Sequence, residues 1–246
     1  MLRYLDKFSI AYHIIPYKRN QDVVRIVRNQ GGWDLVISVV DGYSNPKYFK
    51  GNQEGREVAH LVSKLFPELF YKHAEKDLVR RAKKVAQMID KHVLAIYPER
   101  VACVGIFLFQ KGEKQIIVTV GSVIVYLWNG KEWYKPKEIG DYSLDPKKPE
   151  SYGSDVSRFF GGGDNKDKPV FSCEPDIVET SSYTPVFLAT DGLEDIFDLN
   201  RLNNLTYRII DKRANYFIKK VSLEIIRSKK QIDDISILLK GNLQNE

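Results

Sequence analysis

Residues 22–42, DVVRIVRNQGGWDLVISVVDG, consist of two apolar runs rich in Val and Ile on either side of the tetrapeptide NQGG. This pattern predicts an antiparallel β-hairpin with NQGG as its turn. The second run ends in Asp41-Gly42, and the apolar run TPVFLAT much later in the chain ends in Asp191-Gly192. An Asp-Gly pair ordinarily forms a turn. Because the pair recurs after two apolar runs, we expect the two Asp-Gly pairs to share a role.

A further strand and a pair of helices are predicted around this hairpin. FSIAYHIIP at 8–16 has the composition of a strand, and we expect the N-terminal strands to pair antiparallel in sequential order. From 53 to 97, apolar residues recur three and four positions apart, which predicts two amphipathic helices. Pro67 lies near the middle of this helical region and Pro98 at its end, so we expect the helices to be interrupted there.

The second half of the chain contains more strands and a long irregular segment. VACVGIFLF at 101–109 and KQIIVTVGSVIVYLW at 114–128 are strands, and the NG dipeptide that follows predicts a hairpin with KEWYKP. Residues 136–185 hold six of the ten prolines and three consecutive glycines, which predicts an irregular, exposed flap. TPVFLATDG, one or two helices over about 194–228 and the strand DDISILLK complete the pattern.

This order of elements predicts an α+β fold in a single domain over residues 1–246. Two blocks of consecutive strands, with helices between and after them, favour two antiparallel β-sheets packed as a sandwich and flanked by helix pairs. A chain of 246 residues with 43% hydrophobic residues is long enough to bury one substantial core.

Composition excludes several classes of function. The net charge of +6 comes from 38 basic and 32 acidic residues that are mixed along helices, so we expect no nucleic-acid partner. The longest apolar run is far shorter than a membrane span, and the N-terminus lacks the apolar block of a signal peptide. Cys103 and Cys173 have no metal-binding or disulfide spacing. We therefore expect a cytoplasmic protein.

Four aspartates share one placement, at or next to a predicted strand end. A single aspartate there is more often a turn former or a cap. Four carboxylates gathered at adjacent strand ends would raise one another's pKa values and cost stability unless cations neutralised them. Carboxylates without His or Cys partners favour Mg²⁺ or Mn²⁺ over zinc. The four residues are Asp22, Asp41, Asp191 and Asp233.

The motifs around these aspartates resemble, in order and spacing, those of the metal-dependent protein phosphatase 2C (PPM) family, which includes bacterial serine/threonine phosphatases. The resemblance covers nearly the whole chain, and no single motif in it is specific. It implies the same sandwich flanked by helix pairs. The matching segments are NQD at 20–22, VVDG at 39–42, SRFFGGG at 157–163, PDI at 175–177, FLATDGLEDIF at 187–197 and DDISILL at 233–239.

The resemblance also implies a role for each site residue. Asp41 would bridge two metal ions, and Gly42 would offer its backbone carbonyl to one of them, with Asp22 reaching that ion directly or through its water. The glycine would let the chain turn sharply, because a Cβ would keep the carbonyl away from the ion. Asp191 and Asp233 would hold the other ion.

The implied activity is that of a Mg²⁺- or Mn²⁺-dependent protein serine/threonine phosphatase. Such an enzyme hydrolyses phosphomonoesters through a metal-bound hydroxide and needs no side-chain nucleophile. Its partners would be phosphoprotein substrates of a signalling kinase, or the kinase itself. We expect it to act as a monomer away from membranes.

Three segments depart from the family pattern. Ser122 occupies the position of an Asp that helps hold a third metal, so two ions are implied and a third is not. Tyr17 replaces the usual phosphate-binding Arg, which leaves Arg19 as the candidate for that role. DGYSN, with Tyr43, replaces the family's glycine-rich DGHGG or DGMGG. These departures keep an alternative open, a weakly active or inactive phosphatase-like module that binds phosphoproteins or regulates a kinase.

Overall fold

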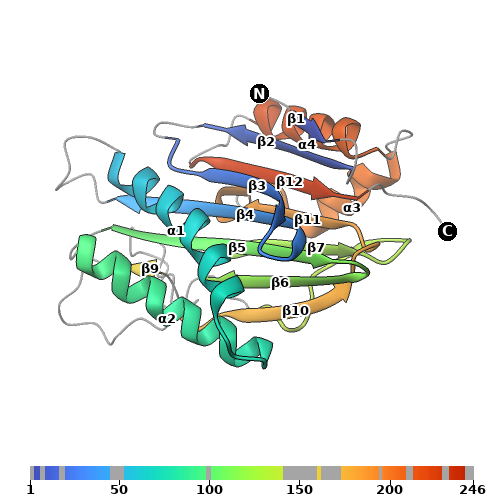
Figure 1. The fold of residues 1–246 in the computed structure, drawn as a ribbon. Helices are drawn as coiled ribbons and strands as arrows, with labels where there is room; N and C mark the ends of the chain where they lie inside the picture. The colour runs from blue at the N-terminus through green and yellow to red at the C-terminus, as the bar shows by residue number, and fades with distance from the viewer. Residues whose placement is uncertain are drawn as a thin grey trace.

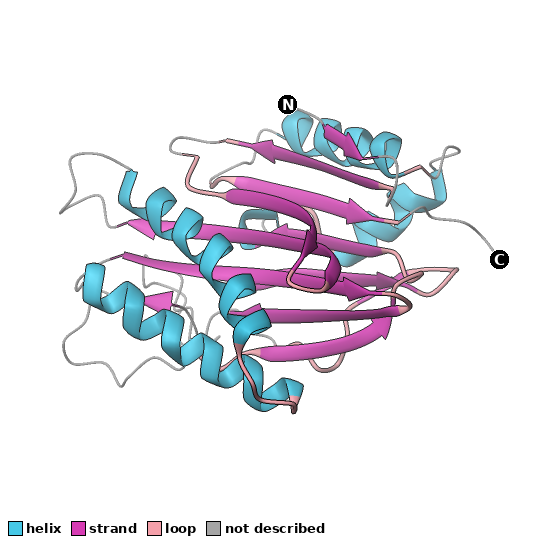
Figure 2. Cartoon of the chain, in the orientation of Figure 1, coloured by secondary structure: helices cyan, strands magenta, loops and turns pink. Residues whose placement is uncertain are grey.

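The computed structural model contains two antiparallel β-sheets packed face to face, with helices on both outer faces (Figures 1 and 2). This α-β-β-α arrangement confirms the predicted fold class. The description covers residues 3–5, 9–16, 20–44, 53–97, 101–140, 160–161, 173–193, 196–208, 213–228 and 233–241.

One sheet joins strands from both ends of the chain, whereas the other is built mostly from consecutive strands. The first, called the β12 sheet, has the order β1 (Arg3–Leu5), β2 (Ile10–Ile15), β12 (Ile235–Lys240), β11 (Val186–Thr190), β7 (Val123–Trp128) and β8 (Trp133–Tyr134). The second, called the β4 sheet, has the order β10 (Asp176–Ser181), β6 (Lys114–Val120), β5 (Val101–Lys111), β4 (Trp33–Ser44) and β3 (Val23–Gln30), and β9 (Phe160–Gly161) pairs with β5.

Helices cover the outer face of each sheet. The β4 sheet carries α1 (Gln53–Lys72) and α2 (Leu78–Ile96), and the β12 sheet carries α3 (Leu199–Arg208) and α4 (Ala214–Ser228) (Figure 1). A short 3₁₀ turn, η2 (Asp191–Leu193), follows β11. No helix in the described part of the chain is both long and apolar enough to cross a membrane.

Strand alternation divides the core into three layers. Along β5, Phe107 and Phe109 face α1, whereas Ile106 and Leu108 face the other sheet, and all four are fully buried. Successive side chains of a strand point to opposite faces, so a strand covered on both faces is apolar throughout. This explains why VACVGIFLF is continuously apolar instead of alternating.

The predicted hairpin at 22–42 is confirmed, although its strands are not joined to β2 as expected. Gln30 pairs with Trp33, and the turn between them uses Gly31 and Gly32 at positive φ of 60° and 79°. The expected sequential pairing is wrong for β2, which pairs with β1 and β12 in the other sheet. The short connection between β2 and β3 lets the chain change sheets, an outcome that local strand signals do not determine.

The two predicted helices are confirmed, but Pro67 does not separate them. It lies inside α1, between Phe66 and Phe70. Phe66 stacks on Phe107 and Phe70 on Phe109, with ring centroids 4.0 and 4.5 Å apart. This buried aromatic packing offsets the backbone hydrogen bond that a proline removes. Pro98 lies outside the described residues.

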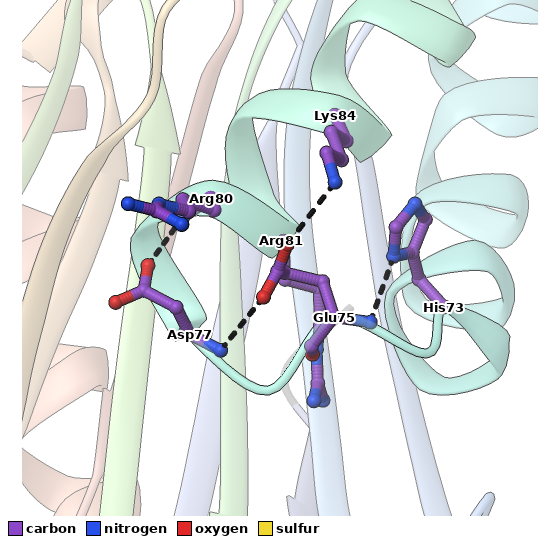
Figure 3. Close-up of polar contacts among 6 residues, drawn as sticks. All are labelled: His73, Glu75, Asp77, Arg80, Arg81 and Lys84. Atoms are coloured by element: carbon purple, nitrogen blue, oxygen red, sulfur yellow. Dashed lines mark hydrogen bonds and ion pairs between the residues drawn. The ribbon is translucent and has the colours of Figure 1, made fainter.

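The helical region is interrupted instead between His73 and Asp77 (Figure 3). Asp77 caps α2 by accepting a 2.7 Å hydrogen bond from Arg80 N. Glu75 N donates to His73 Nδ1 at 3.2 Å, and Lys84 Nζ donates to Glu75 Oε2 at 3.0 Å. These contacts fix the turn that brings α2 back beside α1.

Two predictions for the second half need correction. The apolar run at 114–128 is two strands in different sheets, because the chain leaves β6 and enters β7 at Gly121, which has a φ of 91°. The segment 136–185 is not irregular throughout, since β10 pairs with β6 over six residues. Residues 141–159 and 162–172 of that segment lie outside the described part. The NG hairpin is confirmed by the pairing of Leu127 with Tyr134.

Candidate metal centre

The four aspartates predicted from sequence lie at one end of the sandwich. At this end Asp41 lies in the last stretch of β4, which finishes at Ser44, and Asp191 directly follows β11, whereas strands β3 and β12 start here after Asp22 and Asp233. Asp41 follows Val39 by two residues on β4, so both side chains lie on the same face of the strand. Because Val39 packs between the two sheets, the Asp41 carboxylate also points to the space between them, at the end of the sandwich. The antiparallel order of the strands therefore gathers carboxylates from both sheets.

Three of these carboxylates form a compact cluster. One oxygen from each of Asp41, Asp191 and Asp233 lies within 4.8 Å of the other two. Asp41 and Asp191 are partly buried, whereas Asp233 is exposed, so the cluster opens to solvent on the Asp233 side. Oxygens at this spacing can share a cation.

Asp22 lies behind the cluster and is 2% exposed. Burial raises the pKa of its carboxyl to about 7, although the neighbouring side chains of Asp41, Ser236 and Thr190 oppose that rise. Thr190 Oγ1 donates to Asp22 Oδ2 at 3.0 Å, and within the described residues no donor reaches the buried Oδ1 atom in hydrogen-bond geometry. An oxygen of this kind lacks the partner that buried polar atoms normally have.

Asp41 lies among three other carboxylates. Burial, followed by the charges of Asp22, Asp191 and Asp233, raises the pKa of its carboxyl well above its usual range. Like charges at this distance repel strongly when they are removed from water. The four carboxylates therefore need protons or cations to coexist, as the sequence analysis anticipated.

Residues that the sequence analysis assigned no role position these carboxylates. Thr190 Oγ1 accepts from Ser236 N at 2.9 Å while it donates to Asp22, so it ties β11 to β12 at the cluster. Asp234 is buried and accepts from Gln21 N at 2.7 Å, whereas its own N–H donates to Asp233 Oδ1 at 2.8 Å. Asp234 therefore links the segment before β3 to β12, which is a positioning role.

The predicted turn is confirmed at Asp191-Gly192, which lies in η2, but not at Asp41-Gly42. The pairing of β4 with β5 continues through Gly42, so the chain does not turn there. A Cβ on Gly42 would lie 2.0 Å from the carbonyl oxygen of Gly55 in α1. A Cβ on Gly192 would lie 2.6 Å from the carbonyl oxygen of Asp234. Both glycines admit neighbouring backbone next to an aspartate of the cluster.

Other predicted residues lie around or outside the cluster. Ser122 is partly buried at the corner between β6 and β7, and Tyr43 is 46% exposed directly after Gly42. Arg19 and Tyr17 lie outside the described residues, so the candidate phosphate-binding position stays a prediction. Among the described residues, the clustered ligand atoms come from aspartates, without histidine or cysteine.

Cys103 lies near the cluster, on β5, where it pairs with Gly42. Burial, followed by the charges of Asp41 and Asp90, raises the pKa of its thiol well above the usual range. A thiol that remains protonated is a poor nucleophile. Cys103 therefore packs as a small apolar residue in the core beneath α1.

No protein-family model matches the chain, and no curated protein matches it by sequence. Solved structures, in contrast, match along nearly its whole length. A serine/threonine phosphatase of Staphylococcus aureus has a TM-score of 0.70 at 13% identity, covering 98% of this chain and 97% of its own. The serine/threonine phosphatase PstP/Ppp of Mycobacterium tuberculosis has a TM-score of 0.64 at 14% identity, covering 95% of this chain and 99% of its own.

A third structure is the catalytic domain of the serine/threonine phosphatase PstP in complex with two manganese ions. It has a TM-score of 0.64 at 14% identity and covers 94% of this chain and 96% of its own. At these identities the likeness establishes a shared fold, the sandwich with a helix pair on each face.

Proposed function

We propose that the protein is a divalent-metal-dependent protein serine/threonine phosphatase of the protein phosphatase 2C (PPM) type, and that the described core belongs to a single catalytic domain. The observation that carries this proposal is the convergence of Asp41, Asp191 and Asp233 within 4.8 Å, with buried Asp22 behind them. The shared fold with bacterial serine/threonine phosphatases supports it.

The residues present fit Mg²⁺ or Mn²⁺. The donors are oxygens, which these ions prefer, and the buried Asp22 Oδ1 has no protein donor among the described residues. Asp41, Asp22 and the Gly42 carbonyl would hold one ion, and Asp41 with Asp191 and Asp233 would hold the other. Bound ions would supply the Lewis acidity that activates a water and neutralises the phosphoryl group.

The chain itself contributes position and solvent access. Thr190 and Ser236 hold Asp22 in one orientation, and Asp234 holds Asp233 relative to the segment before β3. The exposed side of the cluster, at Asp233, leaves a route for a phosphorylated side chain to enter from solvent. No ionised thiol is available at Cys103, so attack by water rather than by a side chain fits the site.

The proposal is tested by phosphate release from phosphoserine and phosphothreonine peptides with and without Mn²⁺. We expect metal-dependent turnover that falls at least a hundredfold in Asp41→Asn and Asp191→Asn, since removing a metal ligand removes transition-state stabilisation. Asp34→Asn is the matched control, because Asp34 lies at the opposite end of β4 and accepts a hydrogen bond from Gly112 N at 2.7 Å. Wild-type turnover in both cluster variants, or equal loss in the control, would refute the assignment.

The alternative, a phosphatase-like binding module, is less well supported. A module that only binds phosphoproteins has no need for four crowded carboxylates, which destabilise the fold in the absence of cations. Calorimetric titration of chelator-treated protein with Mn²⁺ separates the two. Absence of both metal binding and turnover on every phosphopeptide would favour the binding module.

A further inference from the structure

One side of α1 carries a row of basic residues that the proposed chemistry does not use. Arg56, His60 and Lys64 follow one another at four-residue spacing, and all three are exposed. Residues four apart on a helix lie on the same face. Together with Arg25 of β3, they are called the basic stripe below.

Arg25 lies beside α1 at the level of His60. It pairs with Ser38 of β4, and Ser38 Oγ donates to Ser63 O of α1 at 3.1 Å. Ser63 Oγ in turn donates to His60 O at 2.8 Å. Arg25 and Val23 point to the α1 side of the sheet, because Val23 packs in the core beneath α1 and the alternate residues Val24 and Ile26 pack between the sheets.

The members of the stripe are close enough to interact. Partial desolvation of its ring lowers the pKa of His60, and the positive charges of Arg56 and Arg25 lower it further. A histidine that feels two guanidinium groups lies in a positive field. The side chains of β3 and α1 therefore form one charged surface.

Glu68 continues the row four residues after Lys64, but no ion pair joins the two within the described part of the chain. The arginines and Lys64 form no ion pair there. The acidic residues of the first turns of α1 belong to the side that faces α2, where Tyr97 Oη donates to Glu57 Oε2 at 3.1 Å. Single exposed cations are ordinary, but a gathered set with no partner favours an anionic ligand.

The stripe begins at the rim of the metal centre. Gly55, which precedes Arg56, places its carbonyl against Gly42, the residue after Asp41. From Arg56 the row runs along α1 away from the aspartates, and its eight residues to Lys64 span about 12 Å. An extended peptide advances about 3.3 Å per residue, so three to four residues would lie along this length.

We propose that the basic stripe binds acidic side chains that flank the phosphorylated residue of a protein substrate. This inference rests on the proposed phosphatase function and adds its substrate class, phosphoproteins with Glu or Asp within a few residues of the phosphosite. The negative charges of such a segment match the three permanent positive charges of Arg25, Arg56 and Lys64.

The test compares two phosphoserine peptides that differ only in carrying Glu or Gln at the flanking positions. We expect wild-type protein with Mn²⁺ to prefer the Glu peptide in kcat/KM by about tenfold at low salt, as several surface ion pairs would give, and to lose this preference at high salt. The triple variant Arg25→Gln/Arg56→Gln/Lys64→Gln should abolish the preference. The control Lys72→Gln/Lys76→Gln/Lys91→Gln removes as many charges from exposed positions elsewhere and should retain it.

Three results would overturn the proposal. The preference could survive in the stripe variant, which would show that other residues select the substrate. The stripe variant could instead lose activity equally on both peptides and on a small chromogenic phosphomonoester, which would assign the stripe to the phosphoryl group itself. Finally, a random oligonucleotide could compete for the stripe as strongly as the Glu peptide does, which would show that the stripe binds polyanions in general.

Failure of the proposed function is distinguishable from failure of this inference. If neither peptide is hydrolysed with Mn²⁺, fluorescence anisotropy with the same two labelled peptides measures binding directly. Tighter binding of the Glu peptide by wild-type protein, lost in the stripe variant and kept in the control, would uphold the stripe without any turnover. Equal binding of both peptides by wild-type protein would refute it.

Discussion

The carbonyl oxygen of Gly55 occupies the space that a side chain on Gly42 would fill, 2.0 Å from the position of its Cβ. This contact sets α1 directly against the β4 residue that follows Asp41. Since Gly55 itself is packed against the Gln21 side chain, three segments meet at this point. The metal centre and the start of α1 therefore depend on each other.

Replacing Gly42 with alanine should displace α1 and the cluster together. We expect Gly42→Ala to destabilise the fold by about 1–3 kcal/mol, typical of overpacking, and to weaken Mn²⁺ binding. Gly112→Ala is the control, since Gly112 has a φ of 55° but no atom within 4 Å of its Cβ position. It should lose about 1 kcal/mol through backbone strain alone. Chemical denaturation and Mn²⁺ calorimetry measure both effects, and normal metal affinity in Gly42→Ala would refute the coupling.

Asp22→Asn should separate stability from metal binding. Because burial raises the pKa of Asp22 to about 7, its charge costs stability in metal-free protein at alkaline pH. An uncharged amide removes this cost. We expect metal-free Asp22→Asn to melt at a higher temperature than metal-free wild type at pH 8. Mn²⁺ should raise the melting temperature of the wild type more than that of the variant. A lower melting temperature for the metal-free variant would contradict this account.

Local patterns were sufficient to predict most elements but not which sheet each strand joins. The hairpin at 22–42 and the helices α1 and α2 follow from residue periodicity and turn composition, which are local properties. The transfer of β2 and β7 to the other sheet depends on contacts with β12 and β11, which are far away in sequence. Only Gly121, between β6 and β7, marked a break locally.

In the metal centre, too, local patterns were predictable from the sequence and contacts between distant segments were not. Four aspartates at strand ends were identifiable because a repeated placement is visible in sequence. Thr190 and Ser236 were not, since a hydroxyl at a strand end gives no sign of the carboxylate it will contact. The turn predicted for the Asp-Gly pairs is present at Asp191-Gly192 but not at Asp41-Gly42. Turn preferences are local, whereas the neighbours that require Gly42 and Gly192 come from other segments.

Thr190→Val should test whether Asp22 needs its hydroxyl partner. The substitution keeps the side-chain shape but removes the donor to Asp22 Oδ2 and the acceptor of Ser236 N. We expect a loss of about 1–3 kcal/mol in the free energy of unfolding, because buried polar atoms are left without partners. Mn²⁺ affinity should fall as Asp22 loses its fixed orientation, whereas Thr190→Ser should retain both properties. Unchanged metal affinity in Thr190→Val would remove the positioning role.

Lys240 provides a pH-dependent test at the opposite end of β12. It is 3% exposed, its Nζ donates to Ser182 O, and burial lowers its pKa from 10.5 to about 8. Between these two pH values the unfolded chain holds the proton and the folded chain releases it. The free energy of unfolding contributed by Lys240 therefore rises with pH across this window, by on the order of 3 kcal/mol.

Lys240→Met removes this dependence while keeping an unbranched apolar side chain. The difference in unfolding free energy, wild type minus variant, should increase from pH 7 to pH 10.5 and level off beyond. Other groups that titrate in this range, such as tyrosines, contribute equally to both proteins unless they contact Lys240. Their contributions to the unfolding free energy therefore cancel in the difference. Urea denaturation at several pH values gives the difference directly. A constant difference across the range would show that Lys240 keeps an ordinary pKa, and that water or another group reaches its ammonium in solution.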